Sequence, residues 1–203
     1  MVCVTDVNAG AQRGRPGYSR DDVINAAVRA FNSRGYDATS MGHVAKELGI
    51  TKSALYHHIS SKEEILELTV AHALSNLEAV VAEVAESDLG PGERVWSLIR
   101  GSIEVLCTDP KSVALLLRLR GNSDVEERAL ERRRKLTRSV VPLVRDAQEA
   151  GEIRADLDAA VLTRMVFGMV NSVAEWYDPK GKLGAEEVAN SVAELLFGGL
   201  RAK

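Results

Sequence analysis

Apolar residues recur with a helical period along most of this chain. Between residues 40 and 48, Met41, Val44, Ala45 and Leu48 are spaced i, i+3, i+4 and i+7, which places them on one face of a helix. Similar stripes follow one another to the C-terminal end, separated by short segments rich in Gly, Pro, Ser and Asp. This pattern predicts an all-α protein of about nine helices.

The segment 39–62 contains two short helices that meet at a tight turn. Gly49 stands where a helix is usually closed by a residue with positive φ, and Thr51 can cap the helix that follows. Few residues of that following helix are suited to a core: Ala54, Leu55 and Ile59. A short helix with small, hydroxyl, aromatic and basic side chains on its outside suits the major groove of DNA.

Further helices surround this motif. Ser19 with Asp22, and Ser61 with Glu64, are start signals for a helix before it and a long helix after it. The segment 87–92, SDLGPG, breaks the long helix, and five more helices follow. We therefore expect a flexible basic arm over residues 1–17, a three-helix unit over 18–64, and a larger helical unit over 65–203.

Composition restricts the functional classes. The net charge of −3 argues against a protein that coats nucleic acid broadly, whereas a reader of one short site needs only local positive charge. Cys3 and Cys107 are far apart and unlike a ligand pair, so we expect a reducing cytoplasm, no disulfide and no metal site. No unbroken run of about twenty apolar residues and no signal-peptide core is present, so we expect no membrane partner.

Residues 18–65 resemble the DNA-binding domain of TetR-family transcriptional regulators. The matching positions are Gly35-Tyr36, Thr39-Ser40, Val44-Ala45, Leu48-Gly49-Ile50, Leu55-Tyr56-His57-His58 and Ser61-Lys62-Glu63. Two positions depart from the family: Gly42 lies inside a helix, where it costs about 1 kcal/mol relative to alanine, and Ile59 replaces a usual aromatic residue. The resemblance implies a regulator, most simply a repressor, that binds double-stranded operator DNA as a homodimer.

Two groups of residues are candidates for DNA contacts. Backbone N–H groups and hydroxyls at the start of a helix, a lysine and a tyrosine can hold phosphates and sugars, which positions the protein without reading sequence; these residues are Thr39, Ser40, Tyr56 and Lys62. Side chains at the start and outside of the next helix can reach base edges: Thr51, Lys52, Ser53, Ala54 and His57. For Tyr56 a packing role is the alternative.

The N-terminal arm carries two arginines. Arg13 and Arg15 precede the first helix, where an arm can lie in the minor groove beside the docked protein. A merely solubilising tail explains the same residues equally well.

The last two helices have more apolar and small residues than a single chain needs. We expect them to pair with their symmetry mates as a four-helix bundle, through Val161, Val173, Ala189, Val192, Ala193 and Leu196. The alternative is that these residues complete the core of one chain.

The family resemblance further implies a small-molecule effector in the larger unit. Residues suited to line its cavity are Trp96, Leu116, Met165, Met169, Asn171, Trp176 and Tyr177, although each is also an ordinary core residue. The segment 171–181 is similar to a TetR subgroup that controls lipid, steroid or aromatic-acid catabolism, several of whose members respond to acyl-coenzyme A thioesters. Arg118 and Arg120 can then meet phosphates, or simply extend into water from a helix end.

Two other functions compete with this one. A DNA-binding dimer without an effector would share every N-terminal feature. An enzyme acting on acyl thioesters would need a nucleophile elbow, a phosphate loop or a zinc-spaced set of ligands, and the sequence contains none of these motifs. We therefore expect no catalytic residue and no cofactor other than the effector.

Overall fold

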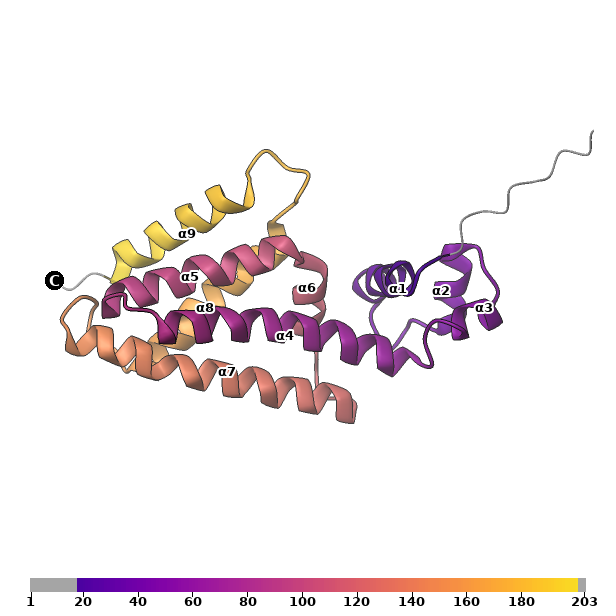
Figure 1. The fold of residues 1–203 in the computed structure, drawn as a ribbon, viewed down its shortest axis with the longest axis horizontal. Coiled ribbons are helices and arrows are strands. Elements are labelled where there is room, and N and C mark those ends of the chain that lie inside the picture. Colours follow the sequence, from indigo (N-terminus) through magenta and orange to yellow (C-terminus); the bar gives the residue numbers. More distant parts are fainter. Residues whose placement is uncertain (1–17, 201–203) are drawn as a thin grey trace, which may run out of the picture.

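A computed structural model describes residues 18–200, which form nine helices and no strand (Figure 1). Their bounds are α1 Arg20–Arg34, α2 Met41–Leu48, α3 Lys52–Tyr56, α4 Lys62–Glu86, α5 Pro91–Thr108, α6 Pro110–Arg118, α7 Asp124–Glu149, α8 Ala159–Trp176 and α9 Ala185–Leu200. The all-α prediction is confirmed, and the three-helix N-terminal unit followed by a larger helical body is visible in Figure 1.

Side-chain caps fix the starts of most of these helices. The side chains of Ser19, Ser40, Thr51, Ser61, Ser123 and Asp158 each accept a hydrogen bond from a backbone N–H in the first turn. At two of these starts the acidic residue of the first turn bonds backbone N–H groups before the capping residue. The carboxylate of Glu64 reaches past Ser61 to the N–H of Ser60. The carboxylate of Glu126 similarly reaches past its cap to the N–H groups of residues 120–122.

Helix α4 connects the two parts of the molecule. It extends from the helices at one end into the larger body (Figure 1), and it contacts α1, α5, α6 and α7. Helix α6 lies at the end of the larger body that faces α1, and these two helices also pack together. A change in the larger body therefore has two routes to the N-terminal helices, α4 and α6.

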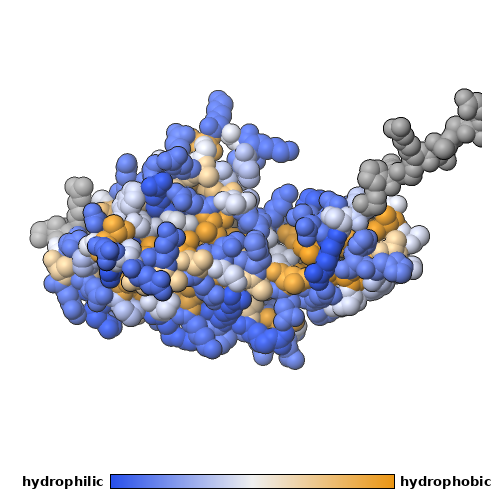
Figure 2. Space-filling model, in the orientation of Figure 1, coloured by the Kyte–Doolittle hydropathy of each residue, from blue (hydrophilic) through white to orange (hydrophobic). Residues whose placement is uncertain are grey.

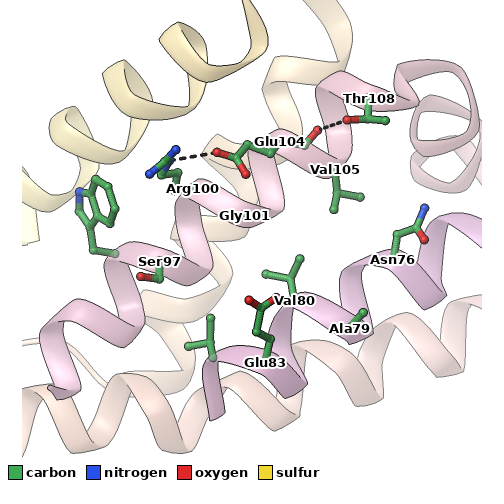
Figure 3. A pocket seen from close by; sticks show the side chains of 12 residues that line it. Asn76, Ala79, Val80, Glu83, Ser97, Arg100, Gly101, Glu104, Val105 and Thr108 are labelled. Atoms are coloured by element: carbon green, nitrogen blue, oxygen red, sulfur yellow. Dashed lines mark hydrogen bonds and ion pairs between the residues drawn. The ribbon is translucent and has the colours of Figure 1, made fainter. Parts of the chain in front are cut away.

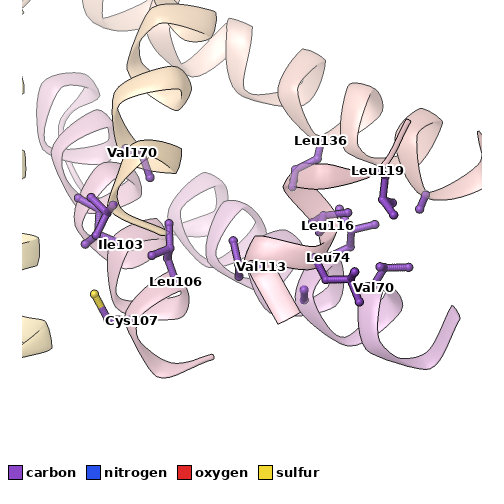
Figure 4. Close-up of a cluster of buried hydrophobic side chains, with 14 of the residues drawn as sticks. Val70, Leu74, Ile103, Leu106, Cys107, Val113, Leu116, Leu119, Leu136 and Val170 are labelled. Carbon is purple, nitrogen blue, oxygen red and sulfur yellow. The ribbon is translucent and has the colours of Figure 1, made fainter. Parts of the chain in front are cut away.

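The larger body is held by aliphatic packing. Figure 4 shows two parts of this cluster: Leu106 of α5 near Val170 of α8, and Leu74 of α4 near Leu116 of α6. These three leucines are almost completely buried. Burying a side chain of this size contributes about 1.5–3 kcal/mol, so the cluster makes the body a stable support for the helices that carry function.

Helix α4 is long and apolar enough, by length and composition alone, to cross a membrane. This was not expected from the sequence, because charged residues interrupt its apolar run. Its residues Ile65, Leu66, Val70 and Leu74 are buried against other helices. On the face shown in Figure 2, hydrophilic side chains cover most of the surface and smaller hydrophobic patches lie between them.

Candidate DNA-binding and effector sites

The turn between α2 and α3 has the sharp bend that the sequence predicts. Gly49 adopts a left-handed conformation with φ 68°, and the N–H of Ile50 donates to the carbonyl of Ala45 over 3.0 Å. Leu55 of α3 and Ile59 just after it are buried and anchor this segment to the N-terminal core. Ala54, expected in the same core, is only half-buried.

The opposite side of α3 faces solvent. Thr51, Lys52, Ser53, Tyr56 and His57 are all exposed, and Tyr56 retains 51% of its accessible surface. The buried anchors and this exposed face lie on one short helix at the far end of the molecule (Figure 1). The arrangement leaves donors, an aromatic ring and a hydroxyl free to meet a large convex partner such as duplex DNA.

Thr39 does not have the predicted role. Its side chain is 2% exposed, and its hydroxyl donates to the carbonyls of Gly35, over 2.8 Å, and Ala30, over 3.3 Å. The hydroxyl therefore closes the turn between α1 and α2 and cannot contact a phosphate. Ser40 is exposed, although its hydroxyl is already used to cap α2.

Lys62 is also bound within the protein. Its ammonium group donates to the carbonyl of Tyr36 over 2.8 Å and lies 4.0 Å from the centre of the Tyr36 ring. That ring packs edge-on against Phe31, with 5.0 Å between ring centroids. The phosphate contact predicted for Lys62 would therefore require its ammonium group to leave Tyr36.

Gly42 has a role that the sequence did not reveal. A Cβ atom at this position would lie 2.7 Å from Cε and 3.2 Å from Nζ of Lys52. The missing side chain on α2 therefore leaves the space in which the lysine of α3 lies. The departure from the family pattern, interpreted from sequence as a loss of helix propensity, also leaves room for the side chain of a candidate base-reading residue.

Gly42→Ala should consequently separate stability from DNA binding. Alanine is favoured in a helix by about 1 kcal/mol, which for a chain of this size raises the melting temperature by about 2–4 °C. Because Lys52 must move, we expect affinity for a specific duplex to fall about fivefold, equivalent to ~1 kcal/mol. Thermal melts and fluorescence anisotropy measure the two effects; a variant with unchanged affinity would show that the position of Lys52 does not matter.

Glu64 links the start of α4 to α1. Its carboxylate accepts hydrogen bonds from the hydroxyl and the N–H of Ser60, and from Arg20 over 2.6 Å. These bonds, those from Ser60 first, lower the pKa of Glu64 from 4.5 to about 2. The ionised carboxylate therefore stabilises the first turn of α4, the helix that carries the N-terminal unit.

Glu64→Gln should destabilise the protein in a pH-dependent way. We expect a loss of about 1 kcal/mol at pH 7, since the pair with Arg20 is partly exposed and screened. The pKa is lower in the folded state, so this stabilisation is present above about pH 4.5 and disappears as the pH falls towards 2. Urea unfolding of both proteins at several pH values should give free energies that converge at low pH, with the neighbouring exposed Glu63→Gln as control.

The residues predicted to line an effector cavity do not converge on one site within the chain. Leu116 is a core residue with 1% exposure, whereas Met165 and Trp176 face solvent with 56% and 54%. The other predicted residues of this group are half-buried or exposed: Trp96, Met169, Asn171 and Tyr177. Between α5, α7 and α8 the chain is packed so closely that a space of only about 10 Å³ remains.

A larger groove lies between α4 and α5. It has a volume of about 600 Å³ and is lined by Asn76, Val80 and Glu83 of α4 and by Trp96, Arg100 and Glu104 of α5 (Figure 3). The guanidinium of Arg100 lies 5.6 Å from the ring of Trp96, and its Nε is 3.0 Å from Glu104. Of the predicted effector residues, only Trp96 borders this groove.

Arg118 and Arg120 lie elsewhere, at the end of α6 that faces α1. Nη1 of Arg118 donates to the backbone carbonyl of Asn32 over 2.9 Å. The side chain of Arg120 is exposed. Both arginines are therefore beside the N-terminal helices and outside the groove that Trp96 lines.

The predicted dimer residues divide into two groups. Val173, Ala189, Ala193 and Leu196 are buried within the chain, because α9 packs on α5 and the inner face of α8 packs on α5 and α7. For these four the alternative, completion of the core, is correct, and Val192 is half-buried. The remaining residue, Val161, is exposed and belongs to a row on the outside of α8, here called the α8 stripe: Val161, Met165, Met169 and Trp176.

The α8 stripe combines Val161, predicted at a dimer interface, with three residues predicted to line an effector cavity. Its members are spaced i, i+4, i+8 and i+15, which keeps them on one face of the helix. Each retains more than 40% of its accessible surface. Rows of exposed large apolar side chains of this kind usually mark an interaction surface.

Some expectations concern other chemistry or other parts of the chain. Arg13, Arg15 and Cys3 lie outside the described residues. Within residues 18–200, no group of three or more His, Cys, Asp or Glu side chains is arranged to hold a metal ion. Burial raises the pKa of the Cys107 thiol to about 11, so this side chain is a protonated core residue.

Comparisons with known proteins agree with the geometry of the N-terminal helices. They also match most of the larger body to a known family. Residues 23–69 match the family of bacterial regulatory proteins named tetR, and residues 88–200 match the tetracyclin repressor-like C-terminal domain. The transcriptional repressor KstR2 of Mycolicibacterium smegmatis is 27% identical over 92% of both chains.

Two solved structures have the same fold over nearly their whole length. SCO3833 of Streptomyces coelicolor A3, a TetR-family member, is 42% identical over 94% of both chains, with a TM-score of 0.81. AibR, solved in complex with isovaleryl coenzyme A and operator DNA, is 27% identical over 88% of this chain and 97% of its own, with a TM-score of 0.72. The exposed face of α3, the matched segments and these relatives lead to one conclusion: the chain belongs to the TetR family of transcriptional regulators and is not an enzyme.

Proposed function

We propose that this protein is a repressor that binds operator DNA as a homodimer through α3. One observation carries the proposal: Leu55 and Ile59 anchor α3 while Lys52, Tyr56 and His57 on its other side stay exposed. In this proposal residues 18–64 form the DNA-binding unit and residues 65–203 the regulatory one. A protein with this role works in the cytoplasm.

The α8 stripe supports the homodimer. Two copies that pair their stripes bury methionine and tryptophan side chains that are otherwise exposed. Pairing about a two-fold axis presents two copies of α3 to one side of a duplex, which suits an operator with two half-sites.

The groove between α4 and α5 supports a small-molecule effector. A molecule that inserts there pushes on α4, and α4 also carries the N-terminal unit. The effector would shift the population towards a form in which the two copies of α3 no longer match the spacing of the half-sites. This role of α4 is a hypothesis. An engineered disulfide that locks α4 to α5 tests it, because induction should then be abolished.

An acyl-coenzyme A thioester is the effector class we favour. The structural neighbour AibR was solved with isovaleryl coenzyme A and operator DNA. The apolar and polar residues around Trp96 suit a short acyl chain and its carbonyl group. The carboxylates of Glu83 and Glu104 disfavour phosphate in the groove itself, so the nucleotide end of such a ligand would lie outside it.

Gel shifts with the promoter of the protein's own gene test both parts of the proposal. We expect a specific complex that acyl-coenzyme A esters dissociate and that free coenzyme A leaves intact. A thermal-shift series should show the melting temperature rising with the same esters, by mass action. A specific complex that no ester dissolves, with no thermal shift, would favour the second candidate, a DNA-binding dimer without an effector.

A further inference from the structure

A second cleft, of about 440 Å³, lies at the joint between the N-terminal helices and the larger body. Its walls come from the end of α1, the α1–α2 turn, the end of α6 and the segment between α6 and α7. Figure 1 shows the facing ends of α1 and α6 that form this joint. The cleft is separate from the α4–α5 groove, since the two share no lining residue.

Two of the three arginines that line this cleft lack partners, whereas Arg118 and both carboxylates have them. Among the described residues, the guanidinium groups of Arg34 and Arg120 form no hydrogen bond or ion pair, and both side chains are exposed. The carboxylate of Glu126 accepts three backbone N–H groups, two of them over 2.8 Å. The carboxylate of Asp37 accepts a bond from Asn122 over 3.3 Å. Arg34 and Arg120 are therefore the charged groups of the cleft that have no partner within residues 18–200.

One more donor in the cleft is unused. The hydroxyl of Tyr36 is buried and has no hydrogen-bond partner. Burial, with nearby carboxylates, raises the pKa of Tyr36 above its usual value, so this hydroxyl keeps its proton and can only gain by donating it. Phe31, Leu115 and Leu119 supply an apolar wall beside these donors.

We propose that this cleft binds a small anion, a molecule with a phosphate or carboxylate group, between Arg34 of α1 and Arg120 beyond α6. Guanidinium groups bind such oxygens through paired, charge-assisted hydrogen bonds. An anion that contacts both arginines bridges the N-terminal unit and the larger body. It would act beside the contact of Arg118 with Asn32, which already joins α6 to α1.

Titration calorimetry without DNA tests the site directly, with inorganic pyrophosphate and hexanoate as the two probes at constant ionic strength. We expect the native protein to bind one of them, and the probe that binds identifies the head group. Arg34→Ala with Arg120→Ala should weaken this binding at least tenfold. Neither side chain has a partner, so the double variant should fold normally. Arg145→Ala, which removes an exposed arginine on α7, is the matched control and should bind like the native protein.

Tyr36→Phe separates a ligand site from a structural contact. The variant should bind the probe several-fold more weakly, while the melting temperature of the free protein stays the same or rises, because the deleted hydroxyl has no partner. No binding of either probe at millimolar concentration would overturn the site. Equal binding by the native protein and the Arg34 and Arg120 double variant would also overturn it, since the anion would then lie elsewhere.

An effect of the anion on operator binding rests on the proposed function, whereas the site itself does not. At matched ionic strength, the bound probe should change the operator affinity of the native protein and leave that of the double variant unchanged. Without the probe, both proteins should bind the operator equally. A probe that binds but leaves operator affinity unchanged would remove the regulatory role and keep the site; failure to bind the operator at all would count only against the proposed function.

Discussion

Alanine at Lys52, Tyr56 and His57 together should reduce affinity for the operator at least a hundredfold without disturbing the fold. All three side chains are exposed on the outside of α3, so their removal leaves no cavity. A good base contact is worth about 1–3 kcal/mol, and removing it lowers affinity for the operator more than affinity for random DNA. Fluorescence anisotropy with operator and random duplexes at one salt concentration measures this difference.

The control for this variant is a lysine outside the reading helix. Lys135→Ala removes one exposed positive charge from α7 and should leave specificity unchanged. Leu55→Ala, on the buried side of α3, should instead lower both stability and affinity, because it removes the anchor of the helix. Retention of specific binding by the triple variant would show that another surface reads the DNA.

Glutamate at Met165 and Met169 should convert the dimer into a monomer. Both side chains lie in the centre of the α8 stripe, so the substitutions would place four carboxylates in one two-fold interface. We expect the dissociation constant of the dimer to rise at least a hundredfold, and operator affinity to fall with it because one half-site holds a monomer weakly. Light scattering coupled to gel filtration measures the molecular mass.

Leu89→Glu is the matched control for the dimer. Leu89 is an exposed leucine in the connection between α4 and α5 and does not belong to the stripe, so its variant should remain dimeric. A Met165 and Met169 double variant that still has the mass of a dimer would show that copies pair through another face, for which the exposed Leu195 of α9 is the next candidate.

Local structure could be predicted well from the sequence because its determinants lie close together in the chain. The hydroxyl of Ser19 and the N–H of Asp22 are three residues apart, and Gly49 needs no distant partner to adopt a positive φ. The bend that presents α3 was therefore visible in the residues themselves. The buried anchors Leu55 and Ile59 followed from the same local pattern.

Contacts between distant residues could not be predicted in this way. Lys62 binds a carbonyl twenty-six positions earlier, and no periodicity shows that a basic residue will point inwards. The space for Lys52 above Gly42 depends on how α2 and α3 cross. Thr39 was predicted to contact a phosphate, but its hydroxyl donates to the carbonyl of Gly35 in the preceding turn.

The regulatory unit was the hardest part to interpret for a similar reason. Helices α8 and α9 are apolar on more than one side, so the sequence does not show which side meets α5 and which remains exposed. Ala189, predicted at a dimer interface, is therefore buried within the chain. Met165, predicted to line an effector cavity, faces solvent.

DNase I footprinting on the promoter of the protein's own gene tests the central claim most directly. The dimer should protect two half-sites related by two-fold symmetry, with their centres about one helical turn or a multiple of it apart. The protein with alanine at Lys52, Tyr56 and His57 should leave the same promoter unprotected. No protected region for the native dimer, or the same footprint for both proteins, would contradict recognition of DNA through α3.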